Sequence, residues 1–111
     1  MAQIYTYIIL KIIKATGADM KFEWDINKNT LNIKKHGISF EEAIQVFSDP
    51  LHLAVLDERY NYFEERWITL GKIKDEKIVV VAHMYFDHNN DEVIRLISAR
   101  KATPAERRQY E

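Results

Sequence analysis

Residues 66–100 decide the fold of this chain, and they read "RWITLGKIKDEKIVVVAHMYFDHNNDEVIRLISAR". Three runs in this stretch, 66–73, 77–86 and 92–100, are rich in the β-branched and aromatic residues that favour strands. The segments between them, "KDE" and "DHNND", have the polarity and length of hairpin turns. Successive strands joined by short turns pair antiparallel, so this stretch predicts an antiparallel β-sheet.

Two helices are predicted before this stretch. Asp25 is a suitable N-cap for a helix over 26–35, and Gly37 stands where a left-handed C-cap is needed. A second helix is predicted over 39–48, because "SFEE" at its start is a capping box. Its apolar residues follow the spacing of one buried helix face, and they are Phe40, Ala43, Ile44 and Phe47.

The remaining elements complete an α+β pattern. Residues 21–24 and 51–57 are predicted strands, and Thr103 begins a short terminal helix with Pro104 at its first position. The predicted order is therefore β-α-α-β-β-β-β-α. We expect one antiparallel sheet with the helices packed mainly on one of its faces.

Composition limits the function classes. The chain has 111 residues, which suits a single domain, and 16 basic against 17 acidic residues exclude a chain-wide basic field. Binding to a nucleic acid therefore requires a local basic patch. The absence of cysteine excludes disulfides and thiolate zinc sites, and it fits a reducing cytoplasm.

The first 19 residues form a separate question. The apolar run from Ile4 to Ile13 is interrupted by Lys11 and is shorter than the roughly 20 residues of a membrane-spanning helix. Its composition favours a β-strand, which we expect to pair with a sheet edge. Because "MKFEWD" at Met20 reads like the start of a folded unit, we expect residues 1–19 to be an extension and residues 20–111 to be the domain.

The last predicted strand carries two arginines among apolar residues. Simple alternation puts Ile94, Leu96, Ser98 and Arg100 on one face, and Val93, Arg95, Ile97 and Ala99 on the other. A shielded guanidinium needs an anion. The anion is either internal, from Asp57, Glu58, Glu64 or Glu65, or a bound phosphate, which the planar guanidinium matches with two hydrogen bonds.

Other candidate residues carry two interpretations each. Lys34, Lys35 and His36 end a helix, where the helix dipole favours cations, and Lys and His are also usual proton-transfer groups. By alternation, Glu65 and Arg66 point to opposite faces at the start of a strand. The other histidines, His52, His83 and His88, lack the spacing of metal ligands, and His83 is expected to be packed rather than catalytic.

Three segments carry a family resemblance. The segments "KFEWDINKNTLNIKKHGISFEEAIQVFSD", "EERWITLGKI" and "IRLISARKATPAERRQYE" resemble the BrnT family, the toxins of a type II toxin–antitoxin system. The resemblance covers residues 20–111. It implies a RelE-like fold and a ribonuclease that inhibits translation. It also implies a partner antitoxin, BrnA, which is similar to ribbon-helix-helix DNA-binding proteins.

The resemblance also implies a site. It groups Lys35, His36, Glu65, Arg66, Arg95 and Arg100 around one cleft that needs no cofactor or metal. Arg66 and Arg95 are the expected phosphate ligands, Glu65 or His36 the expected base, and Lys35 a donor or charge stabiliser. Lys34, Arg107 and Arg108 are expected to contact RNA or the antitoxin.

Two other functions are compatible with the same chain. One is a non-catalytic module that has kept only its antitoxin-binding surface. The other, a repressor that binds DNA by itself, is disfavoured, because the predicted helix over 39–48 contains Glu41 and Glu42 and no basic residue.

Overall fold

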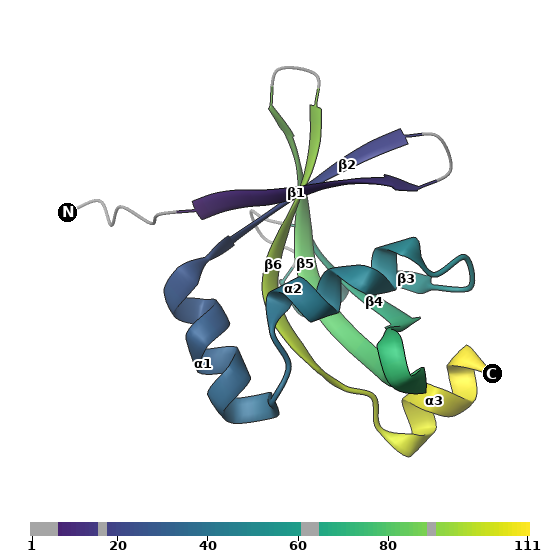
Figure 1. Cartoon of the computed structure of the whole chain (residues 1–111). Coiled ribbons are helices and arrows are strands. Elements are labelled where there is room, and N and C mark those ends of the chain that lie inside the picture. Colours follow the sequence, from purple (N-terminus) through teal and green to yellow (C-terminus); the bar gives the residue numbers. More distant parts are fainter. Residues whose placement is uncertain (1–6, 16–17, 61–64, 89–90) are drawn as a thin grey trace.

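The computed structural model describes residues 7–15, 18–60, 65–88 and 91–111 (Figure 1). These residues form a twisted six-stranded sheet with helices around it, the predicted α+β class. The strands are β1 (Tyr7–Ala15), β2 (Ala18–Asp25), β3 (Leu53–Asp57), β4 (Arg66–Lys72), β5 (Ile78–His88) and β6 (Asp91–Lys101). The helices are α1 (Ile26–His36), α2 (Phe40–Ala43) and α3 (Pro104–Tyr110), with short 3-10 turns η1 (Ile44–Ser48), η2 (Glu58–Tyr60) and η3 (Lys74–Glu76).

The strand order is β1-β2-β6-β5-β4-β3. The hairpins predicted within 66–100 are confirmed, since β4 pairs antiparallel with β5 and β5 with β6. The prediction of a purely antiparallel sheet is wrong at one place, where Lys21–Glu23 of β2 pair parallel with Val93–Arg95 of β6. No hairpin joins these two strands, so the local turn signals carry no information about their direction.

The N-terminal segment forms the predicted extra strand. β1 pairs antiparallel with β2 of the same chain, from Tyr7 opposite Asp25 to Ala15 opposite Ala18. It therefore occupies one edge of the sheet, and β3 is the strand at the other edge. The domain boundary at Met20 stays a prediction. No helix in the described part of the chain is long and apolar enough to cross a membrane.

The helix predicted over 39–48 is wrong in part. Its capping box is present, with Ser39 accepting from the Glu42 amide and Glu42 accepting from the Ser39 amide. However, the α-helix ends at Ala43 and continues as the 3-10 turn η1. Three residues per turn align Ile44 with Phe47, and both are buried. Val46 is buried as well, where η1 approaches Gly71 of β4.

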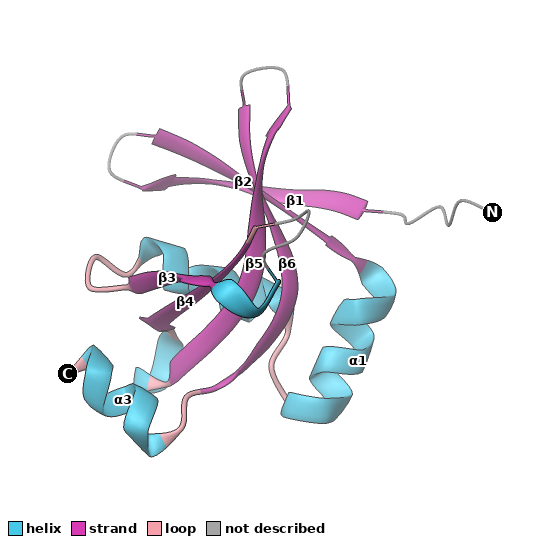
Figure 2. Ribbon diagram, turned by 180° about the vertical axis from the view of Figure 1, so that it is seen from behind, coloured by secondary structure: helices cyan, strands magenta, loops and turns pink. Residues whose placement is uncertain are grey.

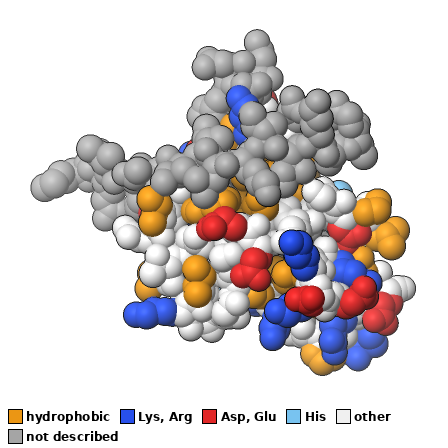
Figure 3. Space-filling view, viewed as in Figure 1, with side chains coloured by type: hydrophobic (Ala, Val, Ile, Leu, Met, Phe, Trp, Pro, Cys, Tyr) orange, Lys and Arg blue, Asp and Glu red, His pale blue; other side chains and the backbone are white. Residues whose placement is uncertain are grey.

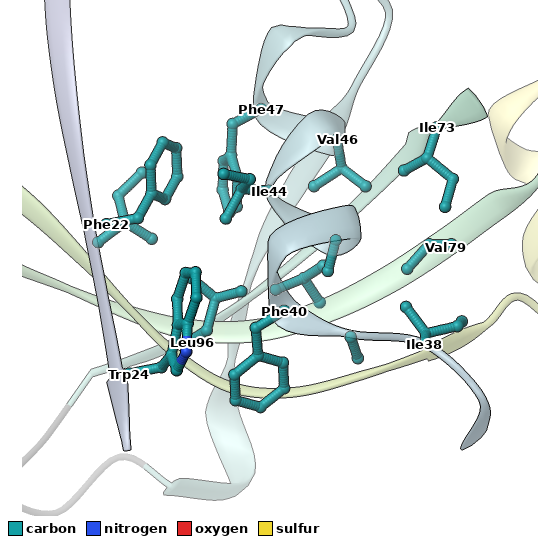
Figure 4. Close-up of a cluster of buried hydrophobic side chains, with 14 residues drawn as sticks. Phe22, Trp24, Ile38, Phe40, Ile44, Val46, Phe47, Ile73, Val79 and Leu96 are labelled. Atoms are coloured by element: carbon teal, nitrogen blue, oxygen red, sulfur yellow. The ribbon is translucent and has the colours of Figure 1, made fainter. Parts of the chain in front are cut away.

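The core lies between the sheet and the α2–η1 segment (Figure 4). Trp24 meets Phe40 edge to face with 5.9 Å between ring centroids, and Phe22 meets Phe47 at 5.4 Å. β4 approaches η1 closely at Gly71, where a Cβ atom would lie 2.8 Å from the Val46 Cβ atom. We call this side of the sheet the core face and the opposite side the open face.

α3 is attached to the other side of the sheet. The helix lies beside β4 (Figure 2). Tyr110 packs with Ile68 and Ala102 against a small cluster of Leu70, Ile78 and Val80, on the open face. The Tyr110 hydroxyl donates to Asp49 Oδ2 at 2.6 Å, and this hydrogen bond raises the pKa of Tyr110 to about 12. Helices thus lie mainly, but not entirely, on the core face.

A bulge in β6 changes the faces that simple alternation predicts. Ala82 of β5 pairs with Ser98, but the next residue, His83, pairs with Leu96, so that Ile97 is an extra residue. Ile94, Leu96 and Ala99 therefore all belong to the core. Arg95 and Arg100, predicted on opposite faces, share the open face, because they pair with Met84 and Val80 of β5.

Asn32 replaces a missing strand neighbour along β6. β2 pairs with β6 only as far as Arg95, which leaves the backbone of Ala99 without a strand on that side. The buried Asn32 amide donates to the Ala99 carbonyl at 2.9 Å and accepts from the Ala99 amide at 3.1 Å. It also donates to the Ile38 carbonyl at 2.8 Å, and so joins α1 to the sheet and to the following loop.

Asn32→Ala is expected to lower the free energy of unfolding by about 2–4 kcal/mol, because it removes the partners of three buried backbone groups. Asn27→Ala is the matched control, since Asn27 is exposed in the first turn of the same helix. Chemical denaturation of both variants measures the difference. Equal stability of the two would show that water replaces the Asn32 amide at no cost.

A fragment of residues 20–111 tests the proposed boundary. We expect it to unfold in one cooperative thermal transition, because every residue described in the core cluster, together with the packed Met20, lies within the fragment. Its solubility should fall, because removal of β1 uncovers the edge of β2. Loss of the cooperative transition would make β1 an integral part of the domain.

Candidate functional site

A cavity lined by three arginines opens on the open face of the sheet. Its volume is about 160 Å³, and its floor is formed by Ile68, Val80 and Ala82 of the two central hairpin strands. The polar part of its wall contains Asp57, Arg59, Arg66, Ser98 and Arg100. We call it the arginine pocket. It brings together two of the predicted site residues, Arg66 and Arg100.

The sheet register positions each member of this pocket. Arg66 begins β4 and lies opposite Asp57, the last residue of β3. Asp57 in turn binds Arg59 with both carboxylate oxygens, at 2.9 Å from Nε and 2.8 Å from Nη2. The hydrogen bonds from Arg59, and the positive charge of Arg66, lower the pKa of Asp57. The pocket therefore contains an ionised carboxylate among its guanidinium groups at neutral pH.

Arg100 is held by a carboxylate of α3. Glu106 accepts from Arg100 Nη1 at 2.8 Å and from Nη2 at 2.9 Å. The same Glu106 carboxylate accepts from the Thr103 amide as part of the capping box of α3. The bonds from Arg100 and Thr103 outweigh partial burial and lower the pKa of Glu106 to about 2. Arg100 thus enters the pocket already oriented.

Arg95 lies outside the arginine pocket. Its Nε donates to the buried Glu23 of β2 at 2.8 Å, and its guanidinium stacks 4.1 Å from the Phe86 ring centroid. The internal ion pairs considered for the two strand arginines are therefore present. Their acids are Glu23 and Glu106, however, and none of the candidates considered from the sequence. Of those candidates, Glu64 lies outside the described residues.

The other predicted site residues are not in the pocket wall. Lys34, Lys35 and His36 form the last turn of α1, close to the end of β6, because Asn32 binds the backbone of Ala99. Glu65 is exposed just before β4. Arg107 and Arg108 are exposed on α3, where Figure 3 shows basic and acidic side chains interspersed at the lower right.

Sequence reasoning missed two members of the arginine pocket. Asp57 was considered only as a counterion, and Arg59 was not considered, because both lie where a strand passes into a loop and show no motif. The cross-strand position of Asp57 opposite Arg66 was the available signal, but it needed the register of β3 on β4. Ser98 shares a face with Arg100, as predicted, but the bulge at Ile97 puts both opposite to Ile94 and Leu96, with which they were grouped.

His83 is a packed residue, as predicted. Its ring is fully buried, lies 4.9 Å from the Phe47 ring and 2.6 Å by Nε2 from the Thr69 hydroxyl. Burial, with a smaller effect of His52, lowers the pKa of His83 to about 3. In the described residues, no group of three or more His, Asp or Glu side chains could hold a metal ion.

These features define an α+β domain with a cluster of arginines on an open sheet face, which suits the binding of a phosphate-containing polymer. The chain belongs to the family of BrnT ribonuclease toxins of type II toxin–antitoxin systems, because the model of that family matches residues 24–106. No curated protein matches the chain.

A solved structure supports the fold. The chain is similar to the ribonuclease toxin BrnT of Brucella abortus, with a TM-score of 0.51 and 23% sequence identity. The similarity covers 72% of this chain and 92% of the Brucella chain. Membership of the family makes this chain a ribonuclease toxin, with RNA as target and an antitoxin as partner. The RelE-like fold stays a prediction.

The buried His83 predicts a loss of stability in acid. Its pKa is about 3 when folded and ~6.5 when unfolded, so unfolding takes up a proton below pH 6.5. The contribution of neutral His83 to the free energy of unfolding is fully present above pH 6.5. The free energy of unfolding then falls by about 1.4 kcal/mol per pH unit down to pH 3. Denaturation at pH 7.5, 6 and 5 measures this slope.

His83→Gln is the control for this effect, because its side chain is neutral at every pH tested and can still bond to Thr69. The variant should show a much flatter dependence between pH 7.5 and pH 5. The same slope in both proteins would assign the acid sensitivity to another group.

Proposed function

We propose that this toxin cleaves RNA without a metal ion, by attack of a ribose 2′-OH on the adjacent phosphate, and that it thereby inhibits translation. The observation that carries the proposal is the arginine pocket, in which Arg59, Arg66 and Arg100 line one small cavity. A phosphate in this cavity would face three guanidinium groups. Such an arrangement stabilises the extra negative charge of a pentacoordinate transition state.

The phosphate has to compete with carboxylates of the protein. Glu106 engages both terminal nitrogens of Arg100, so a phosphate takes over one of these bonds or displaces the carboxylate. Arg59 and Asp57 form a similar bidentate pair. These pairs hold the guanidinium groups in place before RNA arrives, which reduces the reorganisation that transition-state binding requires.

Asp57 is our candidate for the group that accepts the proton of the 2′-OH. It is ionised at neutral pH, because Arg59 lowers its pKa, and it lines the cavity beside Arg66. A base of low pKa is weak, so most of the rate enhancement is assigned to the arginines. His36 and Glu65, the bases expected from the sequence, lie outside the pocket wall and are the alternatives.

Further basic residues offer a path for the RNA backbone. Lys34, Lys35 and His36 at the end of α1 lie beside the part of β6 that carries Arg100. Arg107 and Arg108 follow on α3. We assign these residues to contacts with flanking phosphates, which position the polymer and add affinity without chemistry. Lys35 could also donate a proton to the leaving oxygen.

The proposed partner is a ribbon-helix-helix antitoxin similar to BrnA, and the proposed location is the cytoplasm, where translated RNA is found. DNA is contacted through this antitoxin. The non-catalytic alternative is favoured by the carboxylates that occupy Arg59 and Arg100. On that view the toxin no longer cleaves RNA and only binds its antitoxin.

Arg66→Ala is expected to reduce RNA cleavage by about 10²–10³-fold, the scale of losing one donor to transition-state charge. Expression of this variant without antitoxin should no longer arrest growth. Cleavage of a defined RNA by purified protein in EDTA measures the rate and also tests the independence from metal. Lys28→Ala, which removes an exposed charge from the first turn of α1, is the control and should cleave like the wild type.

Three outcomes would contradict the proposal. Activity that disappears in EDTA and returns with Mg²⁺ or Mn²⁺ would show a metal-dependent enzyme. Full activity of a folded Arg66→Ala variant would exclude the arginine pocket, and no cleavage by the wild type would favour the binding module. Arg95→Ala is a poorer test, because it leaves the buried Glu23 unpaired and so damages the fold.

The proton acceptor is tested separately. Asp57→Asn should reduce cleavage and remove the acid limb of the pH–rate profile, whereas Glu65→Gln and His36→Gln should retain that limb. Its loss in either of the latter variants, with the limb intact in Asp57→Asn, would assign the base to that residue.

A further inference from the structure

We propose that the edge at β3, with the apolar trough beside it, docks a segment of the antitoxin that carries apolar residues and, at one end of them, an acidic residue that enters the arginine pocket. This inference rests on the proposed function, since it assigns the partner of the same face. It identifies where that partner binds and how it stops cleavage.

The trough is a second hollow on the open face, with a volume of about 310 Å³. Leu53 and Val55 of β3 stand on the open face, because they pair with Leu70 and Ile68 of β4. These four side chains and Val80 form its apolar lining, and Glu106 and Gln109 of α3 stand in its wall. It therefore runs between the edge strand and the terminal helix.

Its apolar residues are unusually exposed. Leu53 and Val55 are 43% and 59% exposed, although both belong to a regular strand. Leu51, just before the strand, is exposed as well. Contiguous apolar side chains beside a groove are typical of a surface that another protein covers.

The backbone of β3 points to the same conclusion. In the described part of the chain β1 and β3 are the two edge strands, and β3 pairs with β4 alone. The edge at β3 is the one that adjoins the trough, because Leu53, Ala54 and Val55 line it. An edge strand without a neighbour can pair with an added strand, which supplies main-chain hydrogen bonds while alternate side chains enter pockets. A docked segment along β3 would place every second side chain over the trough.

Charge complementarity identifies the kind of occupant. Ile68 and Val80 line both hollows, so the trough and the arginine pocket adjoin each other. β3 runs from Leu53 at the trough to Asp57 at the pocket. A segment that follows β3 therefore meets aliphatic side chains first and guanidinium groups at the end. An apolar segment with an acidic side chain at one end matches both parts.

The trough itself suits a protein better than RNA. Its lining residues include no aromatic side chain on which a base could stack, and its charged residue is the acid Glu106. Base recognition usually relies on aromatic or guanidinium platforms, which the lining residues of the trough do not offer. A second copy of this chain fits less well, because the carboxylate at the end of β3, Asp57, is already bound by Arg59.

The double substitution Leu53→Thr with Val55→Thr tests the trough. Threonine keeps strand propensity and adds no charge, so the electrostatics of RNA binding stay unchanged. The matched control is Leu31→Gln with Ile33→Gln, which removes two side chains that are 63% and 45% exposed on α1. The probe is the small protein encoded beside the toxin gene, and its affinity for each toxin is measured by calorimetry.

We expect the threonine variant to bind this protein about 10- to 100-fold more weakly, as loss of two buried aliphatic contacts implies, and the control to bind like the wild type. The threonine variant should cleave RNA at the wild-type rate but resist inhibition by the partner. Since cleavage is measured without the partner, failure of the proposed function is detected independently.

Three results would overturn the inference. One is equal affinity of the threonine variant and the control, and another is a neighbouring protein that does not bind the wild type. The third is a wild-type toxin that is dimeric by light scattering and becomes monomeric on the threonine substitutions, which would assign the trough to a second copy.

Discussion

The open face of this protein depends on one irregularity in the pairing of β5 with β6. The extra residue Ile97 lets Leu96 and Ala99 both enter the core, although they are three positions apart and would point to opposite faces in a regular strand. In a regular strand with Leu96 inward, Arg100 would also point inward, where an unpaired charge is very costly. The bulge therefore turns Arg100 to the side that also carries Arg66 and Arg95, and a basic face becomes compatible with an apolar core.

α3 completes this face from outside the sheet. The Glu106 carboxylate caps the helix through the Thr103 amide and at the same time grips Arg100. At the other end of the helix, Tyr110 bonds to Asp49, whose second oxygen accepts from the Leu51 amide just before β3. A short helix of little intrinsic stability is thus fixed at both ends. It is this fixed position that gives the apolar trough its second wall.

The sequence predicted most features whose determinant is local, although the helix predicted over 39–48 becomes a 3-10 turn after Ala43. The hairpins, the capping box at Ser39, the start of the terminal helix at Thr103 and the left-handed Gly37 depend on residues a few positions apart, and the structure confirms them. Contacts between distant segments were not accessible in this way. The parallel pairing of β2 with β6, the bulge at Ile97 and the pairing of Arg95 with Glu23 depend on register, which leaves no trace in composition or spacing. Of the predicted site residues, Arg66 and Arg100 lie together in the arginine pocket. The presence of Asp57 and Arg59 in this pocket became visible only through the pairing of β3 with β4.

The same carboxylates explain how a chain of net charge −1 can act on RNA. Glu106 and Asp57 are tethered beside their arginines, so they compete with phosphate at the millimolar effective concentrations of short linkages. A lone phosphate from solution would rarely displace them, and this keeps free anions out of the pocket. In the proposed function a polymer differs, because contacts to flanking phosphates by residues such as Lys35 and Arg108 would hold the scissile phosphate at a high local concentration as well. An acidic antitoxin segment anchored in the apolar trough would also be held at a high local concentration. Its apolar contacts would keep the carboxylate beside the arginines without any contact to the phosphate-binding residues. On this proposal RNA is held next to the arginines by its flanking phosphates, and the antitoxin is held there by the apolar trough. The guanidinium groups themselves need no selectivity between phosphate and carboxylate.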